Sequence, residues 1–129
     1  METANEKKKV VQLEVVDGIP VVAVDGEVDL ANVGELNDSL RSAGERDAGA
    51  VVVCLERANY FDSAAIHALI SCRARLSTNR QRFLVVQPAT PAGRRILEIA
   101  GLAREDAFLP SREEALDRAR QVVAQRAKS

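Results

Sequence analysis

The sequence predicts one α/β domain: a mixed sheet of four to five strands with about four helices. Short β-branched apolar runs alternate with segments whose apolar residues recur at helical spacing. The first two runs are joined by Asp17 and Gly18, a pair typical of a two-residue hairpin turn. A chain of 129 residues is long enough for one core. The expected order is ββαβαβα(β)α, with an antiparallel hairpin followed by parallel crossovers.

The first half of the chain is expected to hold the hairpin, one helix and the central strand. Residues 10–16 and 19–24 read as strands, and the polar residues 25–27 end the second one. Asp29 is the expected N-cap of a helix that stops at Gly44. Residues 50–55 (AVVVCL) are a continuous apolar run, which is typical of a central strand covered on both faces. The apolar stripe of the helix is Leu30, Val33, Leu36 and Leu40.

The second half is expected to contain two strands and three helices. A loop over residues 56–61 precedes a helix at residues 63–76, and a strand follows at residues 83–86. Thr90 and Pro91 open a third helix that runs to about residue 100. Residues 107–109 are expected to form a short edge strand. The last helix follows Ser111, which has capping-box spacing to Glu114.

Composition and charge exclude several classes of function. There are 18 basic and 19 acidic residues, so no broad positive field would attract nucleic acid. Aromatic residues make up 3% of the chain, which argues against a base-stacking surface.

The first nine residues, METANEKKK, lack an apolar segment, so we expect a flexible tail at residues 1–9, no membrane insertion and a cytoplasmic location. The domain is expected to span residues 10–127.

The few metal-ligating or redox-active side chains do not form a recognisable site. Cys54 and Cys72 are too far apart for a CxxC pair, and His67 is the one histidine. We therefore expect two reduced thiols in or near the core, with no metal and no cofactor.

Four segments carry a resemblance to a known family: GEVDL at residues 26–30, AVVVCL at 50–55, FDSAAI at 61–66 and LEIAGL at 97–102. In order and spacing they resemble the STAS domains of bacterial anti-sigma factor antagonists, over about residues 10–120. The resemblance implies a STAS fold and a regulatory binding module rather than an enzyme. It also implies that Ser63 is phosphorylated by an anti-sigma factor with serine kinase activity and restored by a PP2C-like phosphatase. The unmodified form would bind that anti-sigma factor and release a sigma factor.

The residues at this junction fit a switch. Asp62 is the expected N-cap of a helix that starts at Ser63, so the Ser63 hydroxyl would lie at the surface in the first turn. Where the family usually has Ser or Thr and then Gly, this chain has Ala64 and Ala65, which leaves Ser63 as the one hydroxyl of the motif. The Ala65 methyl favours helix by up to about 1 kcal/mol and would narrow the approach of a partner backbone. The expected partner-binding residues are Asp29, Asp62, Ser63, Ala64, Ala65, Ile66 and His67.

Three alternatives stay open at this point. A STAS subunit of another assembly, such as a stressosome-like scaffold or a lipid-transport ATPase, could use the same face without phosphorylation. A hydrolase could use Ser63 and His67, which share a helical face, but the chain has no G-x-S-x-G elbow and no evident acid to orient His67. A nucleotide-binding module would lack a glycine-rich phosphate loop. The oligomeric state is open between a monomer and a weak dimer.

Overall fold

A five-stranded mixed sheet forms the centre of the protein. The structure, a computed structural model, describes residues 9–128. Strands β1 (Val11–Val16) and β2 (Ile19–Val28) pair antiparallel, and β3 (Ala50–Phe61), β4 (Arg82–Val86) and β5 (Phe108–Leu109) follow in parallel, in the spatial order β1-β2-β3-β4-β5. The predicted mixed sheet, its hairpin and its central strand β3 are confirmed. The tail expected at residues 1–9 lies outside the described residues, except for Lys9.

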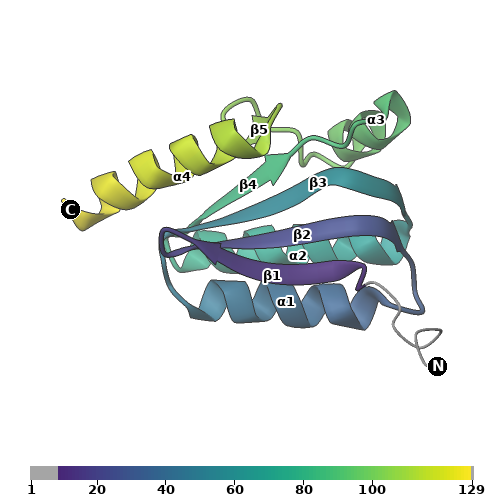
Figure 1. Cartoon of the computed structure of the whole chain (residues 1–129), viewed down its shortest axis with the longest axis horizontal. Coiled ribbons are helices and arrows are strands. Elements are labelled where there is room, and N and C mark those ends of the chain that lie inside the picture. The colour runs from purple at the N-terminus through teal and green to yellow at the C-terminus, as the bar shows by residue number, and fades with distance from the viewer. Residues whose placement is uncertain (1–8, 129) are drawn as a thin grey trace, which may run out of the picture.

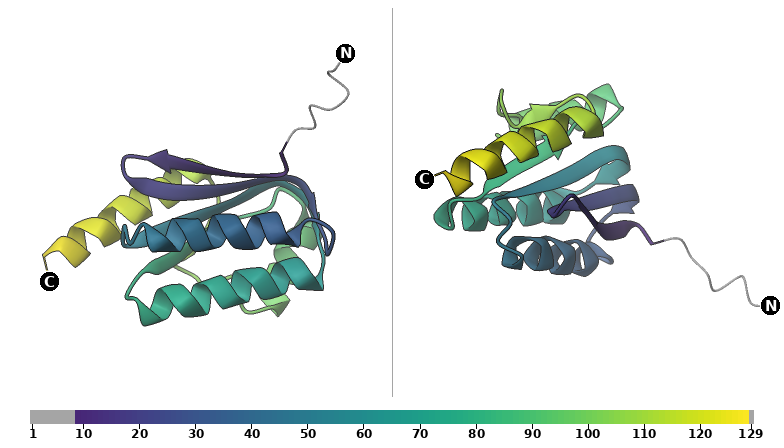
Figure 2. Two further views of the ribbon diagram at one scale, coloured as in Figure 1. Left: turned by 90° about the horizontal axis from the view of Figure 1, so that it is seen from below. Right: turned by 60° about the vertical axis from the view of Figure 1, so that its left-hand side comes forward.

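The helices form one layer on each face of the sheet (Figures 1 and 2). Helices α1 (Val33–Glu45) and α2 (Ser63–Thr78) lie side by side on one face, and α4 (Arg112–Ala127) covers part of the other. The short helix α3 (Pro91–Ile99) lies beyond the carboxyl end of β4. The predicted order of elements is therefore confirmed.

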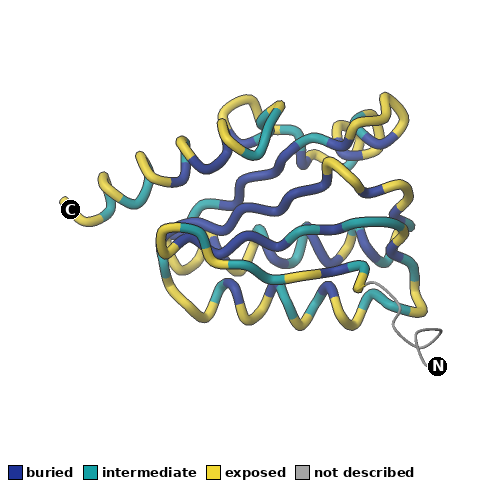
Figure 3. The backbone as a smooth tube through the Cα atoms, in the orientation of Figure 1, coloured by how far each residue is buried: buried dark blue, intermediate teal, exposed yellow. Residues whose placement is uncertain are grey.

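Each face of the sheet has its own apolar core because alternate residues of a strand point to opposite faces. On β3, Val51 and Val53 pack toward α1 and α2, whereas Val52 packs toward α4. Figure 3 shows the resulting band of buried residues along the central strands. Cys54 and Cys72 are free and buried, as predicted.

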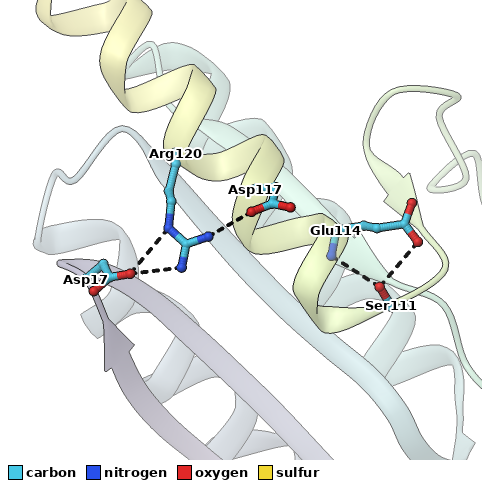
Figure 4. Close-up of polar contacts among 5 residues, drawn as sticks. All are labelled: Asp17, Ser111, Glu114, Asp117 and Arg120. Atoms are coloured by element: carbon cyan, nitrogen blue, oxygen red, sulfur yellow. Dashed lines mark hydrogen bonds and ion pairs between the residues drawn. The ribbon is translucent and has the colours of Figure 1, made fainter.

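Helix α4 is fixed at both its start and its middle (Figure 4). The Ser111 hydroxyl accepts a hydrogen bond from the Glu114 amide at 3.1 Å, which confirms Ser111 as the N-cap. Further along, Arg120 donates to Asp17 in the β1–β2 turn at 2.8 Å and to Asp117 at 2.9 Å. Since these groups are exposed, water screens the ion pairs, and packing of the helix contributes more to stability.

Two strands are longer than the sequence indicates. Residues 25–27 continue β2 instead of ending it, and residues 56–61 belong to β3 instead of a loop. The two extensions pair with each other, with register shifts after Ala23 and after Gly26, where φ is +121°. The shifts explain why the simple alternation of apolar and polar residues is lost here. The extensions carry the chain to the edge where the candidate site lies.

The first helix begins later and ends later than expected. It starts at Val33, so Asp29 is not its N-cap, and Leu30 is 78% exposed rather than part of the buried stripe. Gly44 lies inside the helix, which ends at Glu45. A Cβ at Gly44 would come within 3.3 Å of a Leu76 methyl of α2, so this glycine serves close helix packing rather than termination.

Candidate functional site

Two loops leave the sheet next to each other at the carboxyl ends of β2 and β3. Val28 and Phe61 are the last paired residues of these strands, and the Asp62 amide donates to the Val28 carbonyl at 3.2 Å. Residues 29–32 then lead into α1, and Asp62 leads directly into α2. Ser63 is the first residue of α2 and is exposed, as the sequence predicts.

The Asp62 carboxylate ties both loops together. Its Oδ1 accepts a hydrogen bond from the Ala65 amide at 3.1 Å, which confirms Asp62 as the N-cap of α2. Its Oδ2 accepts a hydrogen bond from the Leu30 amide, also at 3.1 Å. One side chain therefore satisfies an amide of the first turn of α2 and an amide of the loop before α1.

Asp29 and Asn32 shape that loop from within. Asp29 Oδ1 accepts from the Ala31 amide at 3.0 Å, and Asn32 Oδ1 accepts from the Asp29 amide at 2.9 Å. The Asn32 side chain also donates to the Glu27 carbonyl at 2.9 Å. Asp29 thus stabilises a turn next to Asp62 and does not cap α1, because its carbonyl accepts from the Asn32 and Val33 amides in a turn that precedes the helix start at Val33.

A shallow groove of about 480 Å³ runs between the first turns of α1 and α2. Ser63 and His67 are both exposed and lie one turn apart on the α2 side. Within residues 9–128, neither side chain forms a hydrogen bond, and no carboxylate orients His67. The serine and histidine of the hydrolase alternative therefore share a face without forming a nucleophile–base pair. The groove is lined by Val33, Asn37, Ser63, Ala64, His67 and Ala68.

The three residues after Ser63 differ in their exposure. Ala64 is half-buried and lines the groove. Ala65 is 1% exposed, and Ile66 packs against the same core. The expectation that the Ala65 methyl would narrow a partner's approach is wrong, because this methyl points into the core rather than toward solvent.

Most of the large exposed apolar side chains of the described chain lie on segments at or after the carboxyl ends of the parallel strands. Five large hydrophobic residues are exposed within the described chain, and four of them are on elements at the carboxyl ends of the parallel strands. Leu30 is 78% exposed and Tyr60 53%, while Ile96 and Ile99 belong to α3. Exposed apolar side chains beside polar groups are typical of protein-interaction surfaces.

The described part of the chain offers little for other chemistry. No group of three or more His, Cys, Asp or Glu side chains in it is placed to hold a metal ion. None of its helices combines the length and the apolar character needed to cross a membrane.

Several residues of this surface could not be chosen from the sequence. The Leu30 amide and the α1 residues Val33 and Asn37 lie far from Ser63 in the chain. The available signal was topological, since loops after neighbouring parallel strands meet at one edge of a sheet. The exact positions of the two loops depend on the extensions of β2 and β3, which the sequence pattern does not indicate.

The comparison with family models decides the classification. The model of the STAS domain matches residues 10–115. The chain belongs to the STAS domain family. STAS domains are typically regulatory or scaffold domains rather than catalysts. No protein with a curated description matches the sequence significantly.

Solved structures resemble this STAS domain over most of their length. An anti-sigma factor antagonist from Mycobacterium paratuberculosis is 27% identical, with a TM-score of 0.74 over 85% of this chain and 92% of the other. The Bacillus cell fate determinant SpoIIAA in its phosphorylated form is 24% identical, with a TM-score of 0.68 over 84% and 97%. A sulfate transporter family protein from Wolinella succinogenes is 17% identical, with a TM-score of 0.67 over 86% and 92%. The last two show the shared fold alone.

Proposed function

We propose that this STAS domain is an anti-sigma factor antagonist whose binding surface is switched by phosphorylation of Ser63. The unmodified form binds an anti-sigma factor with serine kinase activity and so releases a sigma factor. Phosphorylation at Ser63 ends that binding, and a PP2C-like phosphatase restores it. ATP and Mg²⁺ belong to the kinase in this scheme.

The observation that carries the proposal is the exposed Ser63 at the start of α2, beside a groove and exposed apolar residues. The hydroxyl is open to a kinase because the capping contact of this helix is made by Asp62 and not by Ser63. The 27% identity to an anti-sigma factor antagonist supports the same function.

Charge accounts for the switch. A phosphate adds about −1.5 to −2 charges and three acceptor oxygens at the start of α2. Two like unit charges 5 Å apart repel by about 3 kcal/mol at an effective dielectric constant near 20. About 1.4 kcal/mol changes affinity tenfold. One carboxylate of the partner at that distance from the phosphate is therefore enough to disrupt a complex.

The fold is expected to survive the modification. The helix dipole favours negative charge at the start of α2, which offsets repulsion from Asp62. The Ser63 side chain is exposed and makes no hydrogen bond within the described residues, so no internal contact is lost. Phosphorylation therefore changes the docking surface and leaves the packing of α2 in place.

The direct test is phosphorylation by purified anti-sigma factor kinases encoded in the same genome, with ATP and mass spectrometry of the product. Wild type should gain one phosphate, Ser63→Ala none, and the control Ser77→Ala, at the other end of α2, should behave like wild type. A wild-type chain that binds such a kinase but gains no phosphate would overturn the switch. That result would favour a non-cycling STAS subunit of another assembly, which the Ala64 and Ala65 departures from the family motif also fit.

A further inference from the structure

A second groove lies at the other end of α2, far along the helix from Ser63. It has a volume of about 500 Å³ and lies between the second half of α2, the start of β4 and the segment before β5. Three arginines from these three elements line it, against one acidic residue, Asp106. The groove is therefore a cationic site in a chain whose net charge is −1.

Two of the three arginines have no acidic partner among the residues that the structure describes. Arg82 donates to Asp106 at 2.8 Å, so this pair is already neutral, and Arg82 lowers the pKa of that carboxyl. Arg73 donates to the Gly101 carbonyl at 2.6 Å, which fixes its guanidinium without neutralising it. Within residues 9–128, neither Arg73 nor Arg104 has a carboxylate within 4 Å.

The same groove borders the part of β4 that β5 does not pair. Strand β5 pairs with β4 opposite Val85 and Val86 alone. The Val85 amide donates to the Ala107 carbonyl, so the backbone of Val85 faces the β5 side of β4. Every second residue of a strand presents its backbone to the same side. Phe83 therefore also directs its N–H and C=O toward the β5 side. The Ala107 amide donates to Arg104 instead of to β4. Phe83 lines the groove, and on this side no strand of residues 9–128 pairs with it.

From these two features we infer that the groove binds an extended acidic segment of a partner protein. The segment would extend the sheet by hydrogen bonding to Phe83, and its carboxylates would pair with Arg73 and Arg104. Charge complementarity identifies the partner, because the groove has unneutralised guanidinium groups and its one carboxylate is already paired. A nucleic acid fits less well, since the buried Phe83 is the one aromatic side chain among the described residues that line the groove.

This binding is independent of the Ser63 switch. Ser63 begins α2, whereas Arg73 lies ten positions further along the helix and Ser77 lines the groove near the helix end. One STAS domain would thus present two separate protein-binding surfaces, one gated by phosphorylation and one of constant charge. The Ser63→Ala variant should bind the acidic probe as wild type does.

The test is titration of the full chain with acetylated hexaglutamate at low ionic strength, followed by amide NMR and calorimetry. The NMR signals of the Phe83 and Ala107 amides should shift when the peptide binds. The double variant Arg73→Gln, Arg104→Gln should bind about tenfold more weakly, because it loses two partly exposed ion pairs with the peptide. The matched control, Arg41→Gln with Arg95→Gln, removes the same charge outside the groove and should weaken binding less than about twofold.

Three results would overturn the inference. Equal loss of affinity in both double variants would mean that general charge attraction accounts for binding. Shifts confined to amides outside the groove would place the peptide elsewhere. Stronger binding of tripolyphosphate or oligouridylate than of hexaglutamate, abolished by the groove variants, would identify a phosphate site and not a peptide site.

Discussion

The Asp62 carboxylate accepts one hydrogen bond from Ala65 in its own helix and one from Leu30, which lies 32 residues earlier in the chain. This single side chain therefore sets the position of α2's first turn relative to the loop before α1. Ser63 and the exposed Leu30 flank it. A partner that docks on this surface contacts two segments whose relative position depends on Asp62.

Replacing Asp62 with alanine should destabilise the fold and loosen the loop. Loss of an N-cap costs about 0.5–2 kcal/mol in the free energy of unfolding, and loss of the Leu30 contact adds to it. Urea unfolding would measure the first effect, and hydrogen exchange of the Leu30 amide the second. Asp29→Ala, which removes one local turn contact, is the control and should cost less. Equal stability of wild type and Asp62→Ala would show that the double contact is unimportant.

A glutamate at Ser63 should leave the fold intact. The side chain is exposed at the start of α2, where negative charge is favourable, so the melting temperature should change little. Thermal unfolding followed by circular dichroism checks this. A large drop in melting temperature would mean that Ser63 makes packing contacts, and loss of kinase binding in the variant could then be blamed on unfolding.

Glycine at position 65 should weaken stability without changing partner affinity. Ala65 is 1% exposed inside α2, so Ala65→Gly should cost about 1 kcal/mol from helix propensity, with a further loss from the missing methyl. Affinity for the anti-sigma factor should stay within about twofold, because the side chain does not reach the surface. A large change in affinity at unchanged stability would indicate that Ala65 contacts the partner after all.

The buried thiols should resist alkylation to different degrees. Burial raises the pKa of Cys72 to about 11 from the usual 9.0, so its thiolate is scarce at neutral pH. The pKa of Cys72 is higher in the folded than in the unfolded chain. The buried neutral thiol therefore contributes to the free energy of unfolding below about pH 9, and this contribution is lost as the pH rises through about 11. Iodoacetamide labelling of the native protein with mass spectrometry should modify Cys54, which lines an open groove, before Cys72. Faster labelling of Cys72 would contradict its burial.

The sequence predicted the order of elements well because their local signals were strong. The apolar run of β3, the Asp62 and Ser111 caps and the Asp17 turn each act over a few residues. It failed where tertiary pairing overrides a local signal. Residues 25–27 and 56–61 look like loops, but each segment pairs with the other in the sheet.

The site was predicted only as far as its contiguous part. Asp62, Ser63 and His67 were found because they follow one another along a helix. The prediction that Asp29 caps α1 was wrong, since residues 29–32 form a turn before the helix starts at Val33, whereas its predicted part in partner binding stays a prediction. Asn32 and Asn37 carry no distinctive pattern, and their part in the surface depends on the packing of α1 against α2.

The most direct measurement compares the affinity of the anti-sigma factor for the unmodified chain and for the chain phosphorylated at Ser63. Calorimetric titration with both forms, each checked for folding by circular dichroism, isolates the effect of the added phosphate. Repulsion of a few kcal/mol predicts that the phosphorylated form binds at least about a hundredfold more weakly. Equal affinity of the two folded forms would contradict the account.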